Sequence, residues 1–126
     1  VVPILRNVEN MSMADVEQGI RDYAGKAKTG KLALEDMQGG TFTITNGGVF
    51  GSMLSTPIIN PPEVAILGIS KSYDSVLLKD NKPISITNLP ISLSYDHRII
   101  NGVQGVEFTS RFCEILSDIS YFEESF

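Results

Sequence analysis

The sequence predicts an α/β fold of the α+β kind, with two layers in which helices cover a mixed β-sheet. Segments with the two-residue alternation of β-strands are interspersed with two segments whose apolar residues recur at helical spacing. Helices on one face of a mixed sheet are the simplest architecture for such a chain. Its 126 residues, 42% of them hydrophobic, suffice for one modest core and do not indicate two complete domains.

The first predicted helix covers about residues 13–28. Ser12 followed by Asp15 is a capping-box-like start. The apolar residues after it recur at helical spacing as far as Gly30, where glycine favours a helix end. Before this helix, Val1–Leu5 has the composition of a short strand. The chain therefore predicts a strand, then an amphipathic helix.

The next strand is expected at Thr41–Thr45, which alternates with period two. Phe42 and Ile44 share one face of this strand, and three threonines share the other. The strand ends at Asn46-Gly47-Gly48, where glycine permits a close approach of the backbone. Residues 49–62 are rich in Gly, Ser and Pro but contain apolar residues, which predicts an ordered loop packed on the rest of the fold.

The second half of the chain predicts further strands. Residues 63–70 form a mostly apolar segment typical of a buried strand. Val76–Leu78 and Ile84–Ile86 flank Asp80-Asn81-Lys82-Pro83, which predicts a hairpin. Ile91–His97 alternates so that the histidine prolongs a row of apolar side chains on one face. We therefore expect a last strand that ends at His97.

The last helix is expected to begin at Gly102. Cys113 lies on it among apolar residues, and a buried small apolar side chain is its favoured interpretation. The buried side of the helix is expected to consist of Val106, Phe108, Phe112, Ile115 and Leu116.

Composition excludes several classes of function. The net charge of -5 and the pI near 4.7 argue against a nucleic-acid-binding surface, which needs clustered Lys and Arg. A single cysteine permits no internal disulfide and no CxxC motif, which fits a reducing compartment, and a single histidine is too few for a histidine-built metal cluster. No apolar stretch approaches the ~20 residues that span a bilayer, and no leader opens the chain. We expect a soluble protein without a metal site.

His97 is the candidate catalytic residue. It is predicted at the end of a strand just before a helix, where a side chain can reach a cleft. Neutral imidazole suits the removal of a proton from a thiol, since the unperturbed pKa of imidazole is about 6.5 and that of a thiol about 8.5. By spacing alone, however, a histidine satisfied within the core is the favoured interpretation.

Three blocks of the sequence resemble the catalytic domain of the dihydrolipoyl acyltransferases, the E2 components of 2-oxo acid dehydrogenase complexes. They are residues 40–52 (GTFTITNGGVFGS), residues 56–62 (TPIINPP) with 65–68 (AILG), and residues 94–102 (SYDHRIING). Their order and spacing are also those of the family. Within this family, the residues of the first and last blocks are most similar to those of succinyltransferases of 2-oxoglutarate dehydrogenase complexes. The resemblance covers the C-terminal part of the catalytic domain and implies a chloramphenicol-acetyltransferase-like fold over residues 1–126.

The resemblance implies acyl transfer between a dihydrolipoyl thiol and coenzyme A. His97 matches the family's general base, and Thr45 matches the position whose hydroxyl stabilises the oxyanion. The lipoyl group is carried on a domain outside this chain. The implied partners are two further copies in a homotrimer within a larger cubic assembly, together with the E1 and E3 components. The implied location is the bacterial cytoplasm or the mitochondrial matrix, and neither nucleic acid nor membrane is a partner.

Asn101 departs from the expected pattern. The family pattern has aspartate four residues after the histidine, and asparagine brings an amide without the charge. One interpretation is a tolerated change that leaves an active enzyme. The other is a catalytically inactive scaffold of the same fold that only assembles the complex. A third hypothesis, an antibiotic acetyltransferase of the chloramphenicol type, would usually require a second histidine at the position of Asp96.

The two neighbours of His97 are expected to point away from it. Asp96 precedes the histidine by one residue, so on a strand its side chain lies on the opposite face, and a structural ion pair is its favoured role. Arg98 shares that side. It can pair with a carboxylate or reach a phosphate of the coenzyme, and the sequence leaves both open.

Overall fold

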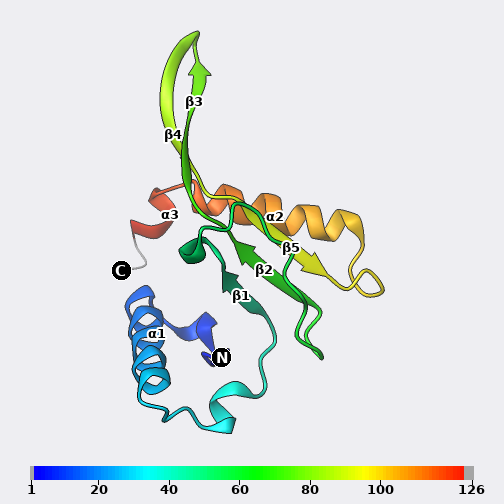
Figure 1. Ribbon diagram of the computed structural model, residues 1–126. Coiled ribbons are helices and arrows are strands. Elements are labelled where there is room, and N and C mark those ends of the chain that lie inside the picture. The colour runs from blue at the N-terminus through cyan, green and yellow to red at the C-terminus, as the bar shows by residue number, and fades with distance from the viewer. Residues whose placement is uncertain (1, 124–126) are drawn as a thin grey trace. The chain divides into compact units, whose positions relative to one another are not determined.

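A computed structural model describes residues 2–123 of the chain. They form two compact units, one made of residues 2–40 with 108–123 and the other of Thr41–Glu107, and each is described by itself. Figure 1 shows the order of the elements along the chain. Among the helices of the described residues, none has the length and apolar character needed to cross a membrane.

The first unit contains α1, Met13–Lys28, whose predicted bounds are confirmed. The Ser12 Oγ accepts a hydrogen bond from the Asp15 N–H, and the Asp15 carboxylate accepts one from the Ser12 N–H, both at 3.1 Å. These two bonds complete the predicted capping box, and they lower the pKa of Asp15. Along the chain, one short 3-10 helix, Val8–Asn10, precedes α1 and another, Leu34–Met37, follows it. The short helix α3, Ser120–Glu123, comes near the end of the described residues.

The predicted strand at Val1–Leu5 is wrong for the part of it that is described. Residues 2–5 are irregular and are held to the unit by single hydrogen bonds. The Ile4 N–H donates to the Asp36 carbonyl, and the Tyr23 hydroxyl donates to the Ile4 carbonyl, each at 2.8 Å. No neighbouring strand pairs with this segment among the described residues, so it forms no ladder.

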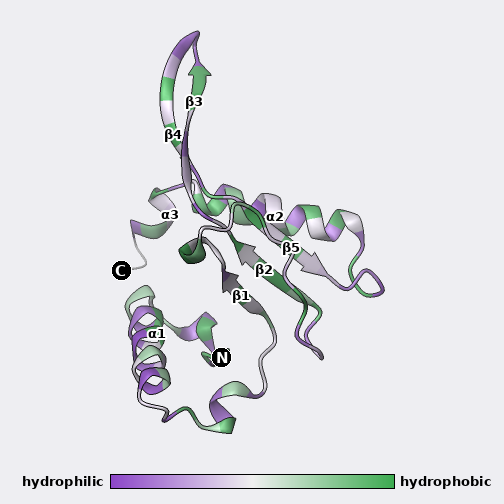
Figure 2. Ribbon diagram, in the orientation of Figure 1, coloured by the Kyte–Doolittle hydropathy of each residue, from purple (hydrophilic) through white to green (hydrophobic). Residues whose placement is uncertain are grey.

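The second unit is built on a mixed sheet, as predicted, and this sheet has three strands. Its strands are β1 (Thr43–Asn46), β2 (Ala65–Ile69) and β5 (Ile91–Tyr95), in the order β1-β2-β5. The central β2 runs parallel to β1 and antiparallel to β5. It carries the buried apolar residues of the unit, and the green ribbon of β2 in Figure 2 shows this hydrophobic run: Ala65, Ile66 and Leu67. Consecutive residues of β2 are buried, so both of its faces are covered, and a strand covered on both faces has this near-continuous apolar sequence.

The alternation in β1 is confirmed, but the face that is buried is the threonine face. Thr43 is buried, whereas Ile44 is 59% exposed. The Thr43 hydroxyl donates to the Glu63 carboxylate at 2.7 Å and accepts from the Asn60 amide at 3.3 Å. These two side chains satisfy the hydroxyl, which therefore occupies the buried side at little cost.

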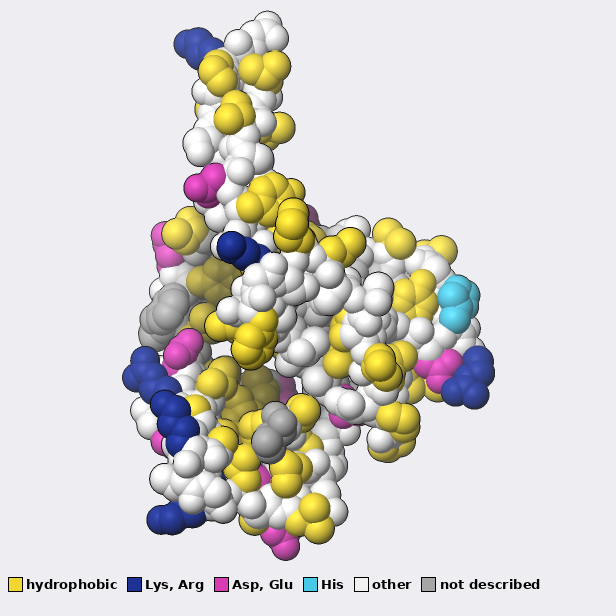
Figure 3. Space-filling model, in the orientation of Figure 1, with side chains coloured by type: hydrophobic (Ala, Val, Ile, Leu, Met, Phe, Trp, Pro, Cys, Tyr) yellow, Lys and Arg dark blue, Asp and Glu magenta, His cyan; other side chains and the backbone are white. Residues whose placement is uncertain are grey.

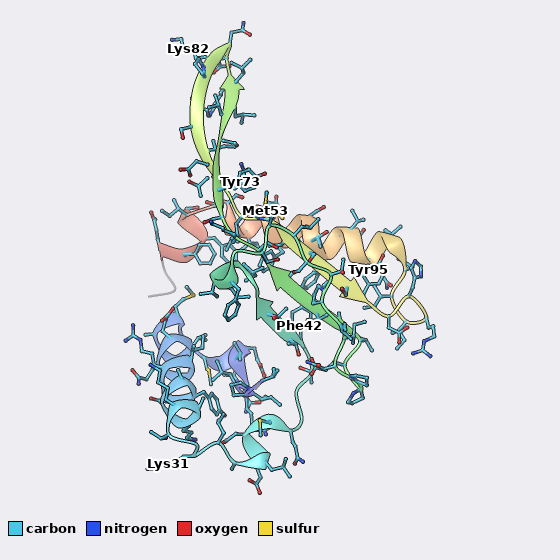
Figure 4. The ribbon with its side chains drawn as sticks, viewed as in Figure 1. Lys31, Phe42, Met53, Tyr73, Lys82 and Tyr95 are labelled. Carbon is cyan, nitrogen blue, oxygen red and sulfur yellow. The ribbon has the colours of Figure 1, made fainter. Side chains whose placement is uncertain are left out.

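A β-hairpin forms a separate two-stranded sheet. Its strands are β3 (Tyr73–Lys79) and β4 (Lys82–Asn88), and Asp80 and Asn81 join them with φ of 53° and 60°. Two consecutive positive φ values are those of a type I′ turn, the tight turn that fits the twist of a hairpin. The hairpin was predicted, and its strands are longer than expected. Lys82 lies at its tip in Figure 4.

The last helix, α2, spans Gly102–Leu116, and its predicted buried side is largely wrong. Gly105 is its buried residue. Cys113 is exposed rather than buried. Of the five residues expected on the buried side, Phe112 and Ile115 are half-buried, whereas three are exposed in this chain: Val106, Phe108 and Leu116.

Candidate active site

His97 lies in a turn between β5 and α2. The strand ends at Tyr95, two residues earlier than predicted, because the Asp96 carbonyl accepts hydrogen bonds from the N–H groups of Ile99 and Ile100 at 3.0 and 2.9 Å. A backbone that folds back on itself in this way cannot continue a strand ladder. The histidine side chain is therefore exposed at the turn and does not prolong the buried row, as the cyan side chain in Figure 3 shows.

A hollow of about 550 Å³ lies beside this turn. Its walls come from Ile59, from residues 61–64 and from residues 95–99, so His97 lines it together with the segment that precedes β2. Three further charged side chains line it: Glu63, Asp96 and Arg98. A neutral imidazole at the rim of a solvent-filled hollow can exchange a proton with a thiol that enters it.

Tyr95 connects the end of the strand to the helix and to the histidine. Its ring centroid lies 5.6 Å from that of His97, with 39° between the ring planes. On its other side it packs so closely against α2 that a Cβ atom on Gly105 would lie 2.7 Å from the Tyr95 ring. Figure 4 shows Tyr95 at the end of β5 next to α2. Only glycine at position 105 leaves room for this ring without a shift.

Thr45 lies in β1 and is half-buried. In the sheet it is level with Gly68 and, one strand further, with Ser92, whereas His97 lies beyond the Tyr95 end of β5. Two strand spacings amount to about 10 Å, and the three residues from Ser92 to Tyr95 add about 10 Å along the strand. Within one chain the structure therefore does not bring the Thr45 hydroxyl and the His97 imidazole to the same reacting atom.

Asn101 is the N-cap of α2. Its Oδ1 accepts a hydrogen bond from the Gln104 N–H at 2.9 Å, and the Asn101 N–H donates to the Gln104 Oε1 at 3.0 Å. This reciprocal pair is a capping box, and Asn101 is not among the residues that line the hollow. The observed role of the side chain is to start the helix that follows the histidine turn.

Sequence analysis missed Gln104 and Gly105. The Asn-x-x-Gln spacing at the start of an apolar periodic segment is a recognisable helix-start signal and would have identified Gln104. Gly105 had no such signal, because its role depends on the Tyr95 ring from a neighbouring strand.

The capping role leads to a prediction about Asn101. We expect Asn101→Ala to lower the free energy of unfolding by about 1 kcal/mol, since alanine cannot accept the Gln104 N–H bond. The free energy of unfolding of Asn101→Asp should equal or slightly exceed that of the parent, because aspartate caps equally well and its charge suits a helix N-terminus. Urea denaturation at one protein concentration would measure both changes. Equal stability of the alanine variant and the parent would contradict the capping role.

No cluster of three or more His, Cys, Asp or Glu side chains suited to a metal ion occurs in residues 2–123.

Comparison with protein families gives one match over nearly the whole chain. Residues 1–122 match the family described as 2-oxoacid dehydrogenases acyltransferase (catalytic domain). A similar curated protein is the dihydrolipoyllysine-residue succinyltransferase component of the 2-oxoglutarate dehydrogenase complex of Pseudomonas aeruginosa, 51% identical over 118 residues. That alignment covers 94% of this chain and 29% of the relative, so the chain spans about three-tenths of the length of the curated relatives it matches.

Solved structures share the fold. A dihydrolipoamide acetyltransferase of Azotobacter vinelandii has a TM-score of 0.91 and 40% identity, over 97% of this chain and 50% of that one. The cubic core of a pyruvate dehydrogenase multienzyme complex has a TM-score of 0.91 and 41% identity over the same shares. The Azotobacter study concerns a serine, a histidine and an asparagine in the catalytic mechanism. They are separated by 52 and four residues, the separations of Thr45, His97 and Asn101 here.

Proposed function

The chain belongs to the family of 2-oxoacid dehydrogenase acyltransferase catalytic domains, and we propose that it transfers a succinyl group between dihydrolipoamide and coenzyme A. Residues 1–126 would be the C-terminal part of such a domain. The observation that carries the proposal is the shared spacing of a hydroxyl residue, a histidine and an asparagine. The succinyl group is favoured because several relatives at about 50% identity are succinyltransferases.

His97 would act as the general base. The imidazole takes the proton from the attacking thiol, and the sulfur forms a bond to the carbonyl carbon of the thioester. The tetrahedral intermediate then collapses, the bond to the other sulfur breaks, and the imidazolium returns the proton to the departing thiolate. One thioester and one thiol enter and leave, so the step needs neither water nor an oxidant. The exposed position of His97 beside a hollow gives a thiol access to it.

Thr45 would stabilise the negative charge on the carbonyl oxygen of that intermediate. Thr45 is half-buried in β1, and its hydroxyl would donate a hydrogen bond to the oxyanion. Its separation from His97 in one chain requires that the two come from different copies. A homotrimer, within the kind of cubic core described for a related complex, supplies such an arrangement.

The proposed setting follows from the family. The lipoyl group reaches the site from a domain outside this chain, and the E1 and E3 components complete the dehydrogenase complex. The bacterial cytoplasm or the mitochondrial matrix is the proposed location.

An inactive scaffold is the alternative function, and Asn101 is the residue that favours it. The capping box weakens that alternative, because asparagine and aspartate both accept the same N–H bond at a helix start. The Azotobacter protein, studied for its catalytic mechanism, also has an asparagine four residues after the histidine.

The test is transfer to free dihydrolipoamide by the full-length protein that contains this chain. Succinyl-coenzyme A and acetyl-coenzyme A are compared as donors at equal concentration. We expect faster transfer from the succinyl donor. Preference for the acetyl donor would overturn the acyl specificity, and no transfer by an assembled particle would favour the scaffold.

We predict that Thr45→Ala lowers kcat by about 100-fold or more, because the variant lacks the oxyanion donor. Thr45→Ser should recover most of the activity, since serine keeps the hydroxyl. Thr41→Ala, the same chemical change at an exposed position just before β1, is the matched control and should retain the parental rate. A Thr45→Ser variant as slow as the alanine variant would count against the hydroxyl.

A further inference from the structure

The turn that carries His97 is fixed mainly by the residue before it. The Asp96 N–H donates to the Val64 carbonyl at 2.8 Å, which joins the turn to the segment before β2. The Asp96 carbonyl accepts the bonds from Ile99 and Ile100 that close the turn. The backbone N–H and the carbonyl of Asp96 are thus both hydrogen-bonded. His97 is the next residue, so its backbone starts from a fixed position.

The side chain of Asp96 binds Arg98, two residues further along the chain. Asp96 Oδ1 accepts hydrogen bonds from the Arg98 backbone N–H and from Arg98 Nε, both at 3.0 Å, and Oδ2 accepts one from Arg98 Nη2 at 2.8 Å. Two parallel charge-assisted bonds from one guanidinium form a fork with defined direction as well as strength. The bonds lower the pKa of Asp96 to about 2, so the carboxylate is charged wherever the imidazole is a base.

The two side chains differ in their surroundings. The Asp96 side chain is 18% exposed, whereas that of Arg98 is 89% exposed. An arginine free to extend into solvent is instead folded back over its own turn. An isolated exposed ion pair contributes little to stability, so global stability alone gives no reason for this arrangement. What the pair does fix is the backbone on both sides of residue 97.

We propose that Asp96 and Arg98 are positioning residues that brace the turn from both sides of His97 and hold its imidazole toward the hollow. This inference rests on the proposed role of His97 as the base. It also assigns Arg98 to the turn rather than to a phosphate of coenzyme A, the two roles that the sequence left open. The other charged group that lines the hollow, Glu63, is engaged by the Thr43 hydroxyl.

The test compares Asp96→Asn with Arg98→Met in the full-length protein. Methionine keeps an apolar stem and removes the guanidinium, and asparagine keeps the shape and removes the charge. We expect kcat to fall roughly 10- to 100-fold in both variants, because small misplacements of a catalytic group have effects of this size. KM for coenzyme A should change less than twofold. The double variant should be no slower than the slower single variant, because each single change already breaks the same Asp96–Arg98 ion pair.

The pH profile of kcat/KM separates positioning from simple charge tuning. Asp96→Asn removes a negative charge and Arg98→Met removes a positive one, so an effect of charge alone would change the rate in opposite directions in the two variants. A brace predicts loss of kcat in both variants across the pH range. A rate that falls in one variant and rises in the other would overturn the proposal in favour of charge tuning.

Two controls make the outcome specific. Glu114→Gln breaks another exposed ion pair, Arg111 with Glu114 at 2.8 Å on α2, and should leave kcat unchanged. Arg98→Lys keeps the charge but not the fork, and an intermediate kcat is expected. A raised KM for coenzyme A with normal kcat in the Arg98 variants would overturn the proposed positioning role of Arg98. Full activity of His97→Ala would instead remove the role of His97 on which the brace depends, and no transfer by the assembled parent would remove the proposed function, so the failures are distinguishable.

Discussion

Replacement of His97 by alanine should lower kcat for succinyl transfer by about 100- to 10,000-fold, the usual contribution of a positioned general base. The side chain is exposed at a turn, and alanine removes no contact that closes that turn, because the closing bonds come from Asp96. The fold should therefore survive the change. KM for the acyl donor should stay close to the parental value, since the imidazole is not required to bind it.

The measurement is steady-state transfer to dihydrolipoamide across pH 6 to 9, with the particle size of each variant checked by light scattering. The residual rate of the alanine variant should also rise with pH, because hydroxide then supplies the missing base. His97→Ala with a rate within a few fold of the parent, in an intact particle, would show that another group accepts the thiol proton.

Replacement of Leu67 by alanine should give the largest loss of stability, about 2 to 5 kcal/mol in the free energy of unfolding. Leu67 is 1% exposed in the middle of the central strand, where it is level with Ile44 of β1 and Leu93 of β5. Strands on both sides limit how far the sheet can collapse into the space. Since β2 is the strand that aligns both of its neighbours, the loss affects the whole sheet.

Urea unfolding at a fixed protein concentration would measure this loss. Leu34→Ala is the matched control, because Leu34 is 65% exposed on a short 3-10 helix and should change stability by under 1 kcal/mol. Equal effects at both positions would mean that β2 is not the core of its unit.

Features governed by near neighbours were predicted well from the sequence. Ser12 and Asp15 cap each other three residues apart, so the start of α1 could be located from the sequence alone. The hairpin turn at Asp80-Asn81 is equally local. His97 and Thr45 were identified through blocks of sequence resemblance, and their roles remain predictions.

Features governed by distant partners were predicted poorly. The buried face of β1 depends on Glu63 and Asn60, which lie across a loop and satisfy the Thr43 hydroxyl. The early end of β5 depends on the bonds that the Asp96 carbonyl accepts from the N–H groups of Ile99 and Ile100. The burial of Gly105 depends on the Tyr95 ring. Apolar periodicity alone could not reveal any of these partners.

The hairpin of β3 and β4 has a consequence for the order of folding. Residues 70–90 separate β2 from β5, and the hairpin occupies most of them. Its two-residue turn closes locally, on the microsecond scale of isolated hairpins. Once it is closed, only residues 70–72 and 89–90 remain to bring the two strands together, and the Ser70 N–H then meets the Pro90 carbonyl at 3.0 Å. Shortening the loop in this way reduces the entropic cost of that pairing by roughly 1 kcal/mol. The hairpin therefore forms early and leaves only a short connection between β2 and β5, so these two strands pair almost as if they were neighbours in the sequence.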